Sequence, residues 1–480
     1  MKLKFIDAKL IAGGATLIAL GGCMVGPDYK RPPAPVADTF KEAGDWKPAQ
    51  PNDAVSRGKW WEIFGDAKLN SLLEQVNVSN ENVRVAEAQL RQAEAVVEQS
   101  RAGLWPTLAV SATATRSRAP NVAGQGSNTT APVNVFNMPL TASWAPDLWG
   151  SVRRNIEGNV ANAQASAANV ANARLLAQAQ LAINYFQLRV LDTRRHLLNT
   201  SVAAYQRSLE LTRNRYDAGV AARVDVVQAE TQLKSTQAQS IDVGVQRAQL
   251  EHAIAILIGK PPAQLTIVAE PLPLAIAIPG VPSGLPSQLL ERRPDIAAAE
   301  RKMAAANAQI GVTTAAYFPS LTLTATNGFR ANSPPDWFTI PSRFWSVGPA
   351  LAETLFDGGV RRAVSKQAQA AYDVNVASYR QTVLAAFQQV EDNLAALRIL
   401  DEEARAQADA VAASRMSTEL TVNQYKAGTV SYLNVVTVQA TQLNNEVSAV
   451  ALLGQRLVAA VTLVQALGGG WDAAQLPSVK

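Results

Sequence analysis

The chain has few of the residues that build catalytic and metal sites. It is 480 residues long and contains one cysteine, Cys23, so a disulfide or a cysteine-based metal site within one chain is excluded. Its two histidines, His196 and His252, are isolated, and each lies in a segment expected to be helical. A glycine-rich phosphate-binding loop, paired histidines and a Gly-x-Ser-x-Gly motif are also missing. We therefore expect no enzymatic activity, no metal and no dissociable cofactor.

Charge is scarce as well. Charged residues make up 17% of the chain, and the formal net charge is +5. Part of that charge comes from Lys2, Lys4 and Lys9, in a segment that we expect to be removed. No concentrated basic face of the kind that binds phosphate backbones remains, so nucleic acid is not an expected partner.

The N-terminus has the pattern of a secretory signal. A basic start precedes an apolar run, Leu10 to Leu20, that is too short to span a bilayer. It ends in Leu20-Gly21-Gly22-Cys23, which resembles the bacterial lipobox, in which the cysteine becomes the lipidated first residue. We therefore expect a signal peptide over 1–22, with diacylglycerol and N-palmitoyl groups on Cys23. Met24 stands where an aspartate would indicate retention at the inner membrane, so we expect the outer membrane.

A proline-rich arm follows over residues 23–65. Six prolines lie between Gly26 and Pro51, and proline fixes its backbone and lacks an amide donor, so we expect an extended segment rather than a domain. The arm ends in an aromatic cluster around Trp60-Trp61, which we expect to pack against the body.

Beyond the arm, proline is absent from two long stretches, between Pro146 and Pro261 and between Pro349 and Pro477. We expect long helices from Ser151 to Asp217 and from Val360 to Tyr425, each about 100 Å long at about 1.5 Å per residue. Helices of this length need helical neighbours. Because they are rich in Ala, Gln and Asn and lack one wide leucine stripe, they favour a wall around a hollow tube over the alternative, a solid coiled coil.

One stretch occurs twice. Arg215-Tyr216-Asp217-Ala218-Gly219 and Gln424-Tyr425-Lys426-Ala427-Gly428 each interrupt a helix-forming run, and their glycines are 209 positions apart. Other blocks repeat at nearly the same offset, so we infer an internal duplication. The expected organisation is a first repeat over 66–265, an equatorial linker over 266–293, a second repeat over 294–471 and a tail over 472–480.

Each half also carries two segments with the alternation of a β-strand. Residues 107–115 and Ser320 to Thr326 alternate polar and apolar side chains, and second strands are expected over Val133 to Ala145 and Trp345 to Phe356. Such segments suit a transmembrane β-barrel, with two soluble hairpins as the alternative. Four strands cannot close a barrel, so we expect several chains to share one. The expected fold class is mainly α with a β-barrel portion.

Together these features resemble the TolC-like outer-membrane efflux family, in the lipoprotein branch that serves RND pumps. The resemblance covers essentially the whole chain and is carried by Cys23 to Tyr29, Trp60 to Asp66, Leu289 to Ile296, Leu467 to Trp471 and the two Tyr-x-x-Gly turns. It implies a homotrimer with a twelve-stranded barrel, four strands from each chain, and a periplasmic α-helical tunnel. It also implies a passive duct that carries drugs or other small molecules outward from a periplasmic membrane-fusion adaptor and an inner-membrane RND pump.

In this family the two helical turns form a periplasmic gate and the adaptor contact. Gly219 and Gly428 suit the left-handed conformation that reverses a helix, and Ser431 is expected to cap the helix that follows. Leu433 matches the position of an apolar plug. The residues expected to act in gating or adaptor contact are Arg215, Tyr216, Gly219, Asp225, Tyr425, Gly428, Leu433 and Asn434.

The charge pattern at the second turn departs from that of the family. Thr437 stands where an acidic residue is often found, and Ala440 and Gln424 stand where basic ones are found. We therefore expect a gate held more by packing and hydrogen bonds than by ion pairs. Two other functions stay open: a type I secretion duct for polypeptides, and a structural coiled-coil lipoprotein that bridges the layers of the envelope.

Overall fold

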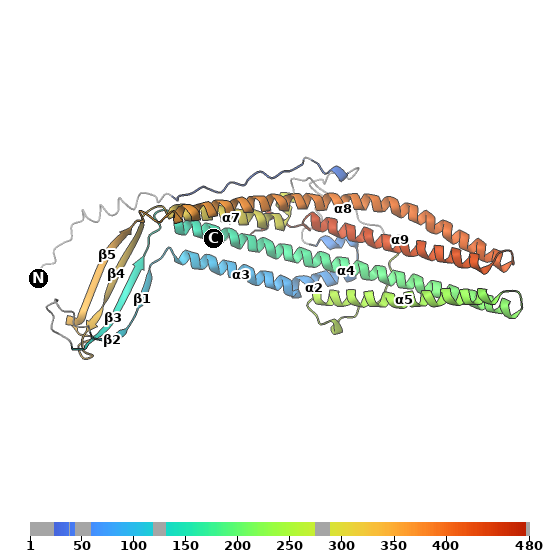
Figure 1. The fold of residues 1–480 in the computed structure, drawn as a ribbon, viewed down its shortest axis with the longest axis horizontal. Coiled ribbons are helices and arrows are strands. Elements are labelled where there is room, and N and C mark those ends of the chain that lie inside the picture. The colour runs from blue at the N-terminus through green and yellow to red at the C-terminus, as the bar shows by residue number, and fades with distance from the viewer. Residues whose placement is uncertain (1–23, 38, 44–58, 119–130, 274–288, 477–480) are drawn as a thin grey trace.

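The computed structural model describes residues 24–37, 39–43, 59–118, 131–273 and 289–476. The expected signal peptide and Cys23 lie outside these residues. The described chain is long and narrow, with one β-sheet at one end and helices running side by side from the sheet to the other end (Figure 1).

The two halves of the chain contain the same succession of helices with the same lengths. The first half has α3 (Glu81–Ala102, 22 residues), α4 (Ser151–Asp217, 67 residues) and α5 (Arg223–Leu257, 35 residues). The second half has α7 (Pro294–Ala315, 22 residues), α8 (Val360–Lys426, 67 residues) and α9 (Tyr432–Ala466, 35 residues). Thus α4 covers the range expected from the sequence, and α8 ends one residue beyond it.

Short helical pieces complete the described chain. They are η1 (Lys41–Ala43), η2 (Trp60–Phe64), α2 (Ala67–Ser79), η3 (Pro262–Gln264), α6 (Leu289–Arg292), η5 (Ile340–Ser342) and η6 (Ala473–Gln475). Of the described helices, only α9 is long and apolar enough to cross a membrane by length and composition, and 56% of its most apolar window is buried inside the molecule. It packs against α4 and α8 along its length.

The same local device begins both 67-residue helices. Before α4, the Asp147 carboxylate accepts hydrogen bonds from the backbone N–H groups of Val152 (3.0 Å) and Arg153 (2.9 Å). Before α8, the Asp357 carboxylate accepts from the backbone N–H groups of Gly359 (2.9 Å) and Arg361 (3.1 Å). An aspartate at this place accepts hydrogen bonds from N–H groups that have no partner within the helix. Its negative charge also interacts favourably with the positive end of the helix dipole.

The strands form one antiparallel sheet. They are β1 (Thr107–Val110), β2 (Thr113–Ser117), β3 (Val133–Trp144), β4 (Ser320–Ala331) and β5 (Arg343–Ala352). Both β1 and β2 pair with β3, β3 pairs with β4, and β4 pairs with β5, so strands from the two halves meet at the β3–β4 pair.

The sheet corrects two expected strands. The first strand is broken at residues 111–112, although β1 and β2 keep one register along β3. Ser111 N–H still donates to the Pro139 carbonyl (3.2 Å), but Pro139 has no N–H to return the bond, so the ladder is interrupted there. The last strand runs over 343–352 rather than 345–356, because Arg361 binds Glu353 and the Thr354 carbonyl and draws that segment into the start of α8.

The largest apolar core lies halfway along the helices, where the N-terminal arm meets the body. Trp60 and Trp61 are buried there, with ring centroids 5.8 Å apart in an edge-to-face arrangement. Trp60 Nε1 donates to Gln178 Oε1 on α4 (3.1 Å). The aromatic cluster of the arm therefore packs against the body, as expected from the sequence.

Candidate functional site

The α4–α5 and α8–α9 turns lie together at the end of the molecule farthest from the sheet (Figure 1). Gly219 has φ +70° and Gly428 has φ +77°, conformations that glycine adopts at little cost. The same bond closes each turn, from Val220 N–H to the Arg215 carbonyl (2.8 Å) and from Thr429 N–H to the Gln424 carbonyl (3.0 Å). Both predicted glycines therefore reverse a helix in the same way.

A single side chain joins the two turns. Arg215 Nη1 donates to the carbonyl oxygens of Tyr425 and Lys426, both at 3.1 Å, and its guanidinium lies 4.8 Å from the centroid of the Tyr425 ring. These carbonyls belong to the last turn of α8, where acceptors have no partner within the helix and a positive charge is favourable. Arg215 thus binds the first hairpin to the end of the second within one chain.

The two repeated tyrosines have different surroundings. Tyr425 is buried and its ring meets that of Tyr432 edge-on, at 5.3 Å between centroids, whereas Tyr216 is 43% exposed. Burial, together with the neighbouring Tyr425, raises the pKa of Tyr432 to about 12. Below this pair, Tyr205 Oη donates to the Gln439 carbonyl (3.2 Å).

Sequence reasoning missed Tyr205 and Tyr432 as parts of this end. A signal for each is present in the chain: Tyr432 directly precedes Leu433, and Tyr205 lies about three helical turns before Tyr216 on α4. Because residues at helical spacing share a face, Tyr205 could have been placed on the face of α4 that leads to the first turn. Tyr432 could have been placed beside the second turn from its position in the sequence.

The other predicted residues are less enclosed. Leu433 is 55% exposed and Asn434 is also exposed in the first turn of α9, while Asp225 is half-buried in the first turn of α5. The expected cap at Ser431 is wrong, because this residue precedes α9 but its hydroxyl makes no capping hydrogen bond. The first turn of α9 is instead fixed by the burial of Tyr432 and Val435.

Ion pairs contribute little at this end. Among the described residues of 205–235 and 420–440, one ion pair is present, Arg213–Glu230, with 3.9 Å between nitrogen and oxygen and both side chains about half exposed. Exposed pairs of this kind contribute about 0–1 kcal/mol. Within one chain, the contacts between the turns are therefore hydrogen bonds to backbone and aromatic packing.

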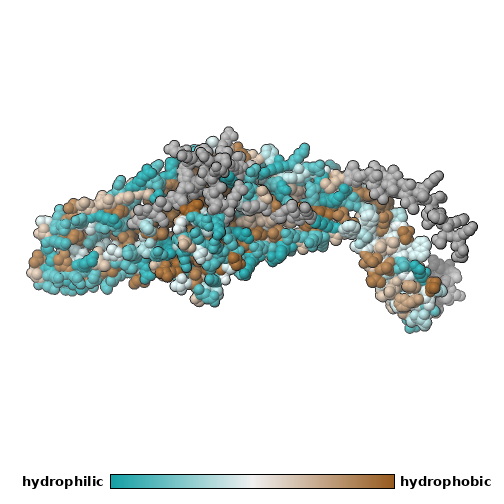
Figure 2. Space-filling model, turned by 180° about the vertical axis from the view of Figure 1, so that it is seen from behind, coloured by the Kyte–Doolittle hydropathy of each residue, from teal (hydrophilic) through white to brown (hydrophobic). Residues whose placement is uncertain are grey.

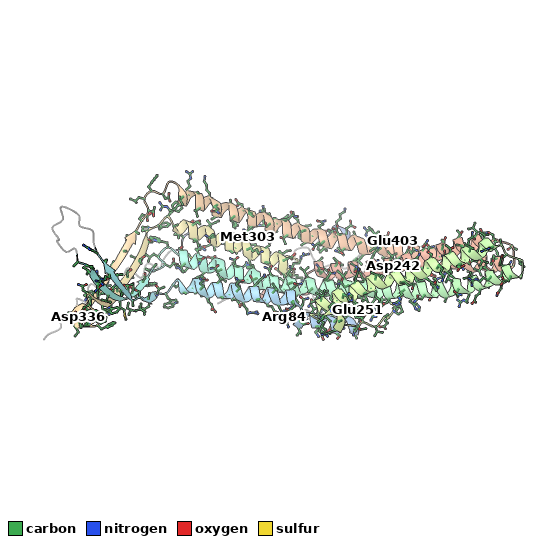
Figure 3. The ribbon with its side chains drawn as sticks, turned by 60° about the horizontal axis from the view of Figure 1, so that its bottom comes forward. Arg84, Asp242, Glu251, Met303, Asp336 and Glu403 are labelled. Atoms are coloured by element: carbon green, nitrogen blue, oxygen red, sulfur yellow. The ribbon has the colours of Figure 1, made fainter. Side chains whose placement is uncertain are left out.

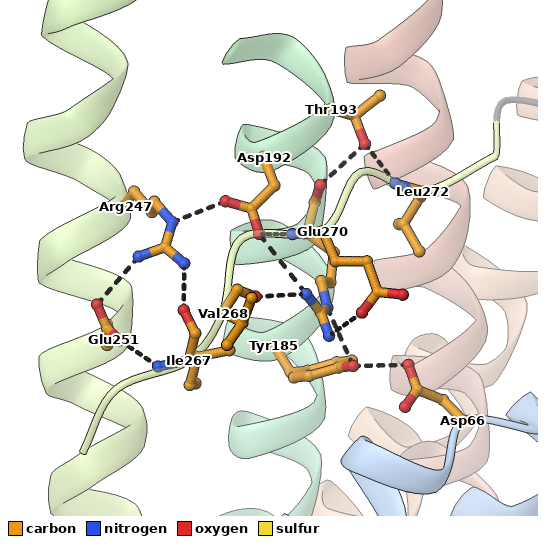
Figure 4. Close-up of polar contacts among 11 residues, drawn as sticks. Asp66, Tyr185, Asp192, Thr193, Arg247, Glu251, Ile267, Val268, Glu270 and Leu272 are labelled. Carbon is orange, nitrogen blue, oxygen red and sulfur yellow. Dashed lines mark hydrogen bonds and ion pairs between the residues drawn. The ribbon is translucent and has the colours of Figure 1, made fainter. Parts of the chain in front are cut away.

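A second polar cluster lies halfway along the helices, where the segment after α5 crosses α4 (Figure 4). The buried Asp192 carboxylate accepts from Arg247 Nε (2.7 Å) and from the backbone N–H of Glu270 (3.1 Å). Arg189 lies 3.7 Å from the same carboxylate and donates to the Val268 carbonyl (3.0 Å). The cluster thus fastens this part of the linker to α4 and α5.

The same cluster reaches the N-terminal arm. Arg189 Nε donates to Tyr185 Oη (3.0 Å), and Tyr185 Oη donates to the carboxylate of Asp66 (2.7 Å). Burial and the bond to Asp66 raise the pKa of Tyr185. Sequence reasoning missed this cluster, whose local signals are the Arg189–Asp192 pair at i, i+3 on α4 and the Arg247–Glu251 pair at i, i+4 on α5.

The first described residues of the arm are held where the sheet meets the helices. Val25 N–H donates to the Trp149 carbonyl (3.1 Å). Arg154, which is 1% exposed, binds the carboxylate of Asp28 (2.8 Å) and the carbonyl of Gly26 (3.1 Å). Gly26 has φ +95° and lies so close to α7 that a Cβ atom there would be 2.4 Å from the Cα of Gly311.

The sheet has one apolar and one polar face. In the register of the strands, side chains of alternate rows project to the same face. Two neighbouring rows of the apolar face are Leu108, Ala142, Ala325, Val347 and then Val110, Leu140, Asn327, Trp345. Two rows of the opposite face are Thr107, Ser143, Thr324, Gly348 and then Ala109, Thr141, Thr326, Ser346. Figure 2 shows hydrophobic residues gathered on the sheet, in contrast to the largely hydrophilic helical body.

The sheet leaves strand edges open and carries aromatic rings where it meets the helices. In the described chain, β5 pairs on one side only, as do β1 and β2. Trp149 stacks on Phe318 at 4.8 Å between centroids and donates to the Pro319 carbonyl (2.7 Å), and Trp144 donates to the Leu104 carbonyl (3.0 Å). Open edges can pair with another chain, and aromatic rings gather at membrane–water interfaces.

Comparison with known proteins gives consistent matches along the chain. The family model described as outer membrane efflux protein matches residues 72–260 and 285–469. The chain is 31% identical over 470 residues to the antibiotic efflux pump outer membrane protein ArpC of Pseudomonas putida, a match that covers 96% of each protein. It is 31% identical over 468 residues to outer membrane protein OprJ of Pseudomonas aeruginosa, covering 97% of this chain and 96% of that protein. Among solved structures, the outer-membrane channel OprN matches with a TM-score of 0.86 and 31% identity, over 94% of this chain and all of that one.

Proposed function

Because this chain belongs to the outer membrane efflux protein family, we propose that it is the exit duct of a tripartite RND efflux pump, in which three copies form one channel. The family is a channel component of the outer membrane and not an enzyme. In our proposal, a periplasmic membrane-fusion adaptor and an inner-membrane pump supply the cargo, and the channel conducts it passively to the exterior.

The observation that carries the proposal is the two-faced sheet with open edges. Strands β3 and β4 are 12 residues long, so each extends about 40 Å and, tilted by about 40°, spans about 30 Å, the thickness of the hydrocarbon core. The apolar face suits lipid and the hydroxyl-rich face suits a water-filled lumen. With β1 and β2 counted as one strand, three chains would supply twelve strands and pair every open edge.

The helices extend this lumen into the periplasm. At about 1.5 Å per residue, α4 and α8 are each about 100 Å long. We propose that three chains place these helices around a hollow tunnel, with the two turns at its inner end. Arg215, Tyr425 and Tyr432 would hold the hairpins of each chain together, and Leu433 would narrow the opening where three chains meet.

Lipid on Cys23 would anchor each chain beside the barrel. The position of Val25 against Trp149 supports this proposal, because it brings the start of the arm to the junction of sheet and helices, where the aromatic rings Trp149 and Phe318 also lie. An acyl chain there would enter the inner leaflet of the outer membrane.

Two measurements on the purified protein test the proposal. Light scattering should give about three times the mass of one chain, and planar-bilayer recording should show discrete conductance steps. A trimer without conductance would favour the structural lipoprotein that bridges the envelope. A deletion strain that keeps its drug resistance but fails to secrete a polypeptide would favour the type I secretion duct.

A further inference from the structure

Charge in the strand regions is almost entirely positive and lies at one end. Residues 104–146 contain two charged side chains, Arg116 and Arg118, and no acid. Residues 318–352 contain Arg330 and Arg343, with Asp336 as the one acid. All five lie at or beyond the strand ends farthest from the helices, where Figure 3 labels Asp336.

The strand register divides these arginines between the two faces. Arg116 pairs with Asn134 on the face that also carries Phe136, and Arg343 pairs with Phe329 on the same apolar face. Arg330 pairs with Asn137 and projects to the opposite, polar face. Arg116 and Arg343 are both exposed, so two positive charges stand at the outer end of a face that is otherwise apolar.

Aromatic side chains lie beside these charges. The segment between β4 and β5 folds back so that Trp337 lies 5.4 Å from Phe136 and Phe338 lies 5.8 Å from Phe329, measured between ring centroids. Phe136 and Phe329 belong to the apolar face, so Trp337 and Phe338 cover its outer end. Next to them, Ile340 is 89% exposed.

The one acid nearby does not neutralise the arginines. The Asp336 carboxylate accepts a hydrogen bond from the Ser333 hydroxyl, and its backbone carbonyl accepts from Thr339 and Ser342, so it shapes its own turn. Arg343 Nε donates to Asn327 Oδ1 (3.3 Å), which leaves the rest of its guanidinium exposed. In the described chain, neither Arg116 nor Arg343 has an acidic partner within 4.0 Å.

We propose that Arg116, Arg343 and the rings of Trp337 and Phe338 bind a phosphorylated lipid headgroup in the outer leaflet of the outer membrane. This inference rests on the proposed function, which turns the apolar face toward lipid. A guanidinium binds phosphate oxygens through two parallel N–H donors, and aromatic rings settle at the level of lipid headgroups. A soluble anion inside the channel would instead meet Arg330 on the polar face.

Closure of the barrel strengthens the site. Arg343 lies on β5 and Arg116 on β2, at the two opposite edges of the sheet of one chain. When three chains pair these edges, the outer end of each seam receives one arginine from each neighbour. Two like charges on one apolar surface repel each other, and a bound phosphate removes that repulsion.

The test compares the purified trimer with two variants. One is the double variant Arg116→Gln/Arg343→Gln, and the matched control is Arg330→Gln, which removes an arginine from the same end of the sheet but from the polar face. The probe is lipid A, a diphosphorylated glycolipid, in neutral detergent, with its dephosphorylated form and inorganic phosphate as separate arms. Native mass spectrometry measures the lipid retained by each trimer.

The expected result is selective. Lipid A should bind equally well to the unaltered trimer and to Arg330→Gln. It should bind at least about tenfold more weakly to the double variant, because each arginine near an anionic surface contributes a several-fold factor in affinity. Equal retention by the double variant, or equal binding of dephosphorylated lipid, would overturn the site. Saturation by inorganic phosphate alone would make it a general anion site and overturn the lipid assignment. Conductance of the same samples keeps the two proposals apart, because a conducting trimer without selective lipid binding refutes only this inference.

Discussion

Arg215 is the residue on which the contact between the two helical turns depends. Its partners are backbone carbonyls, so changes of side chain in the second hairpin leave them in place, whereas loss of the guanidinium removes two hydrogen bonds and the contact with Tyr425. The resemblance of the turn to that of the efflux family predicted a role for Arg215. It could not predict the partner, because the carbonyls of residues 425 and 426 approach it only in the folded chain.

Replacement of this residue should loosen the inner end. We expect Arg215→Ala to weaken the contact between the hairpins by about 1.5–3 kcal/mol, the range for hydrogen bonds made by a charged donor, and to raise the open probability in planar bilayers. The matched control is Arg213→Ala, two residues earlier on α4, whose one ion pair is exposed. If both variants had the same effect, the loss of a positive charge would explain it, and the hydrogen bonds from Arg215 to α8 would not be what holds the two turns together.

The buried tyrosine pair predicts a response to alkaline pH. The pKa of Tyr432 is raised to about 12 in the folded chain, so its contribution to stability is fully present below the ordinary value of about 10 and is lost as pH rises through about 12. Tyrosinate from Tyr432 should therefore appear around pH 12, above the range of ordinary tyrosines, and the inner end should loosen as pH rises from about 10 to 12. Tyr432→Phe should lack this component, and an unchanged titration curve would contradict the assignment.

At the scale of elements, the long helices follow from the sequence and the details of the sheet do not. The proline-free runs and the repeated glycine turns are local signals, so the ends of α4 and α8 could be placed closely. The break between β1 and β2 depends on Pro139, which lies in the partner strand. A break of this kind is set by the pairing register, which no single segment contains.

The arm offers a test of close packing. Gly26→Ala should destabilise the contact between the arm and α7, since Gly26 has φ +95° and a Cβ atom would lie 2.4 Å from the Cα of Gly311. We expect faster proteolysis within residues 24–43 and a lower melting temperature. Gly244→Ala is the control, because this glycine lies within α5 with nothing within 4 Å of the added atom, and alanine there should stabilise by about 1 kcal/mol.

The polar cluster at mid-length makes a second prediction for the elements. Asp192→Asn removes a buried charge that faces Arg189 and Arg247, and it should lower the free energy of unfolding by about 3–5 kcal/mol. Denaturant unfolding measures this loss. The exposed Asp242 on α5, labelled in Figure 3, supplies the control Asp242→Asn, which should change little. Similar losses in both variants would mean that Asp192 does not hold the linker in place.

At the scale of the whole molecule, Leu433 should act only in the assembly. It is 55% exposed in one chain, so its packing partners would come from neighbouring chains. We expect Leu433→Ala to raise the open probability in planar bilayers and to leave the stability of each chain almost unchanged. Leu420→Ala, at a residue of α8 that is 56% exposed, is the control. A closed channel in the Leu433 variant would remove this residue from the gate.

The repeated turns also show why one half of the chain cannot replace the other. Equal helix lengths would let six half-chains surround one axis, as three whole chains would in the proposed trimer. At the turns, however, Gln424 occupies the place of Arg215, and Arg223 occupies the place of Tyr432. One half supplies the arginine and the other supplies the rings and carbonyls that receive it. A ring of six identical halves would hold six arginines and no tyrosine pair, or six tyrosine pairs and no Arg215. The two halves are therefore complementary at the turns, because the contact made by Arg215 needs one half of each kind.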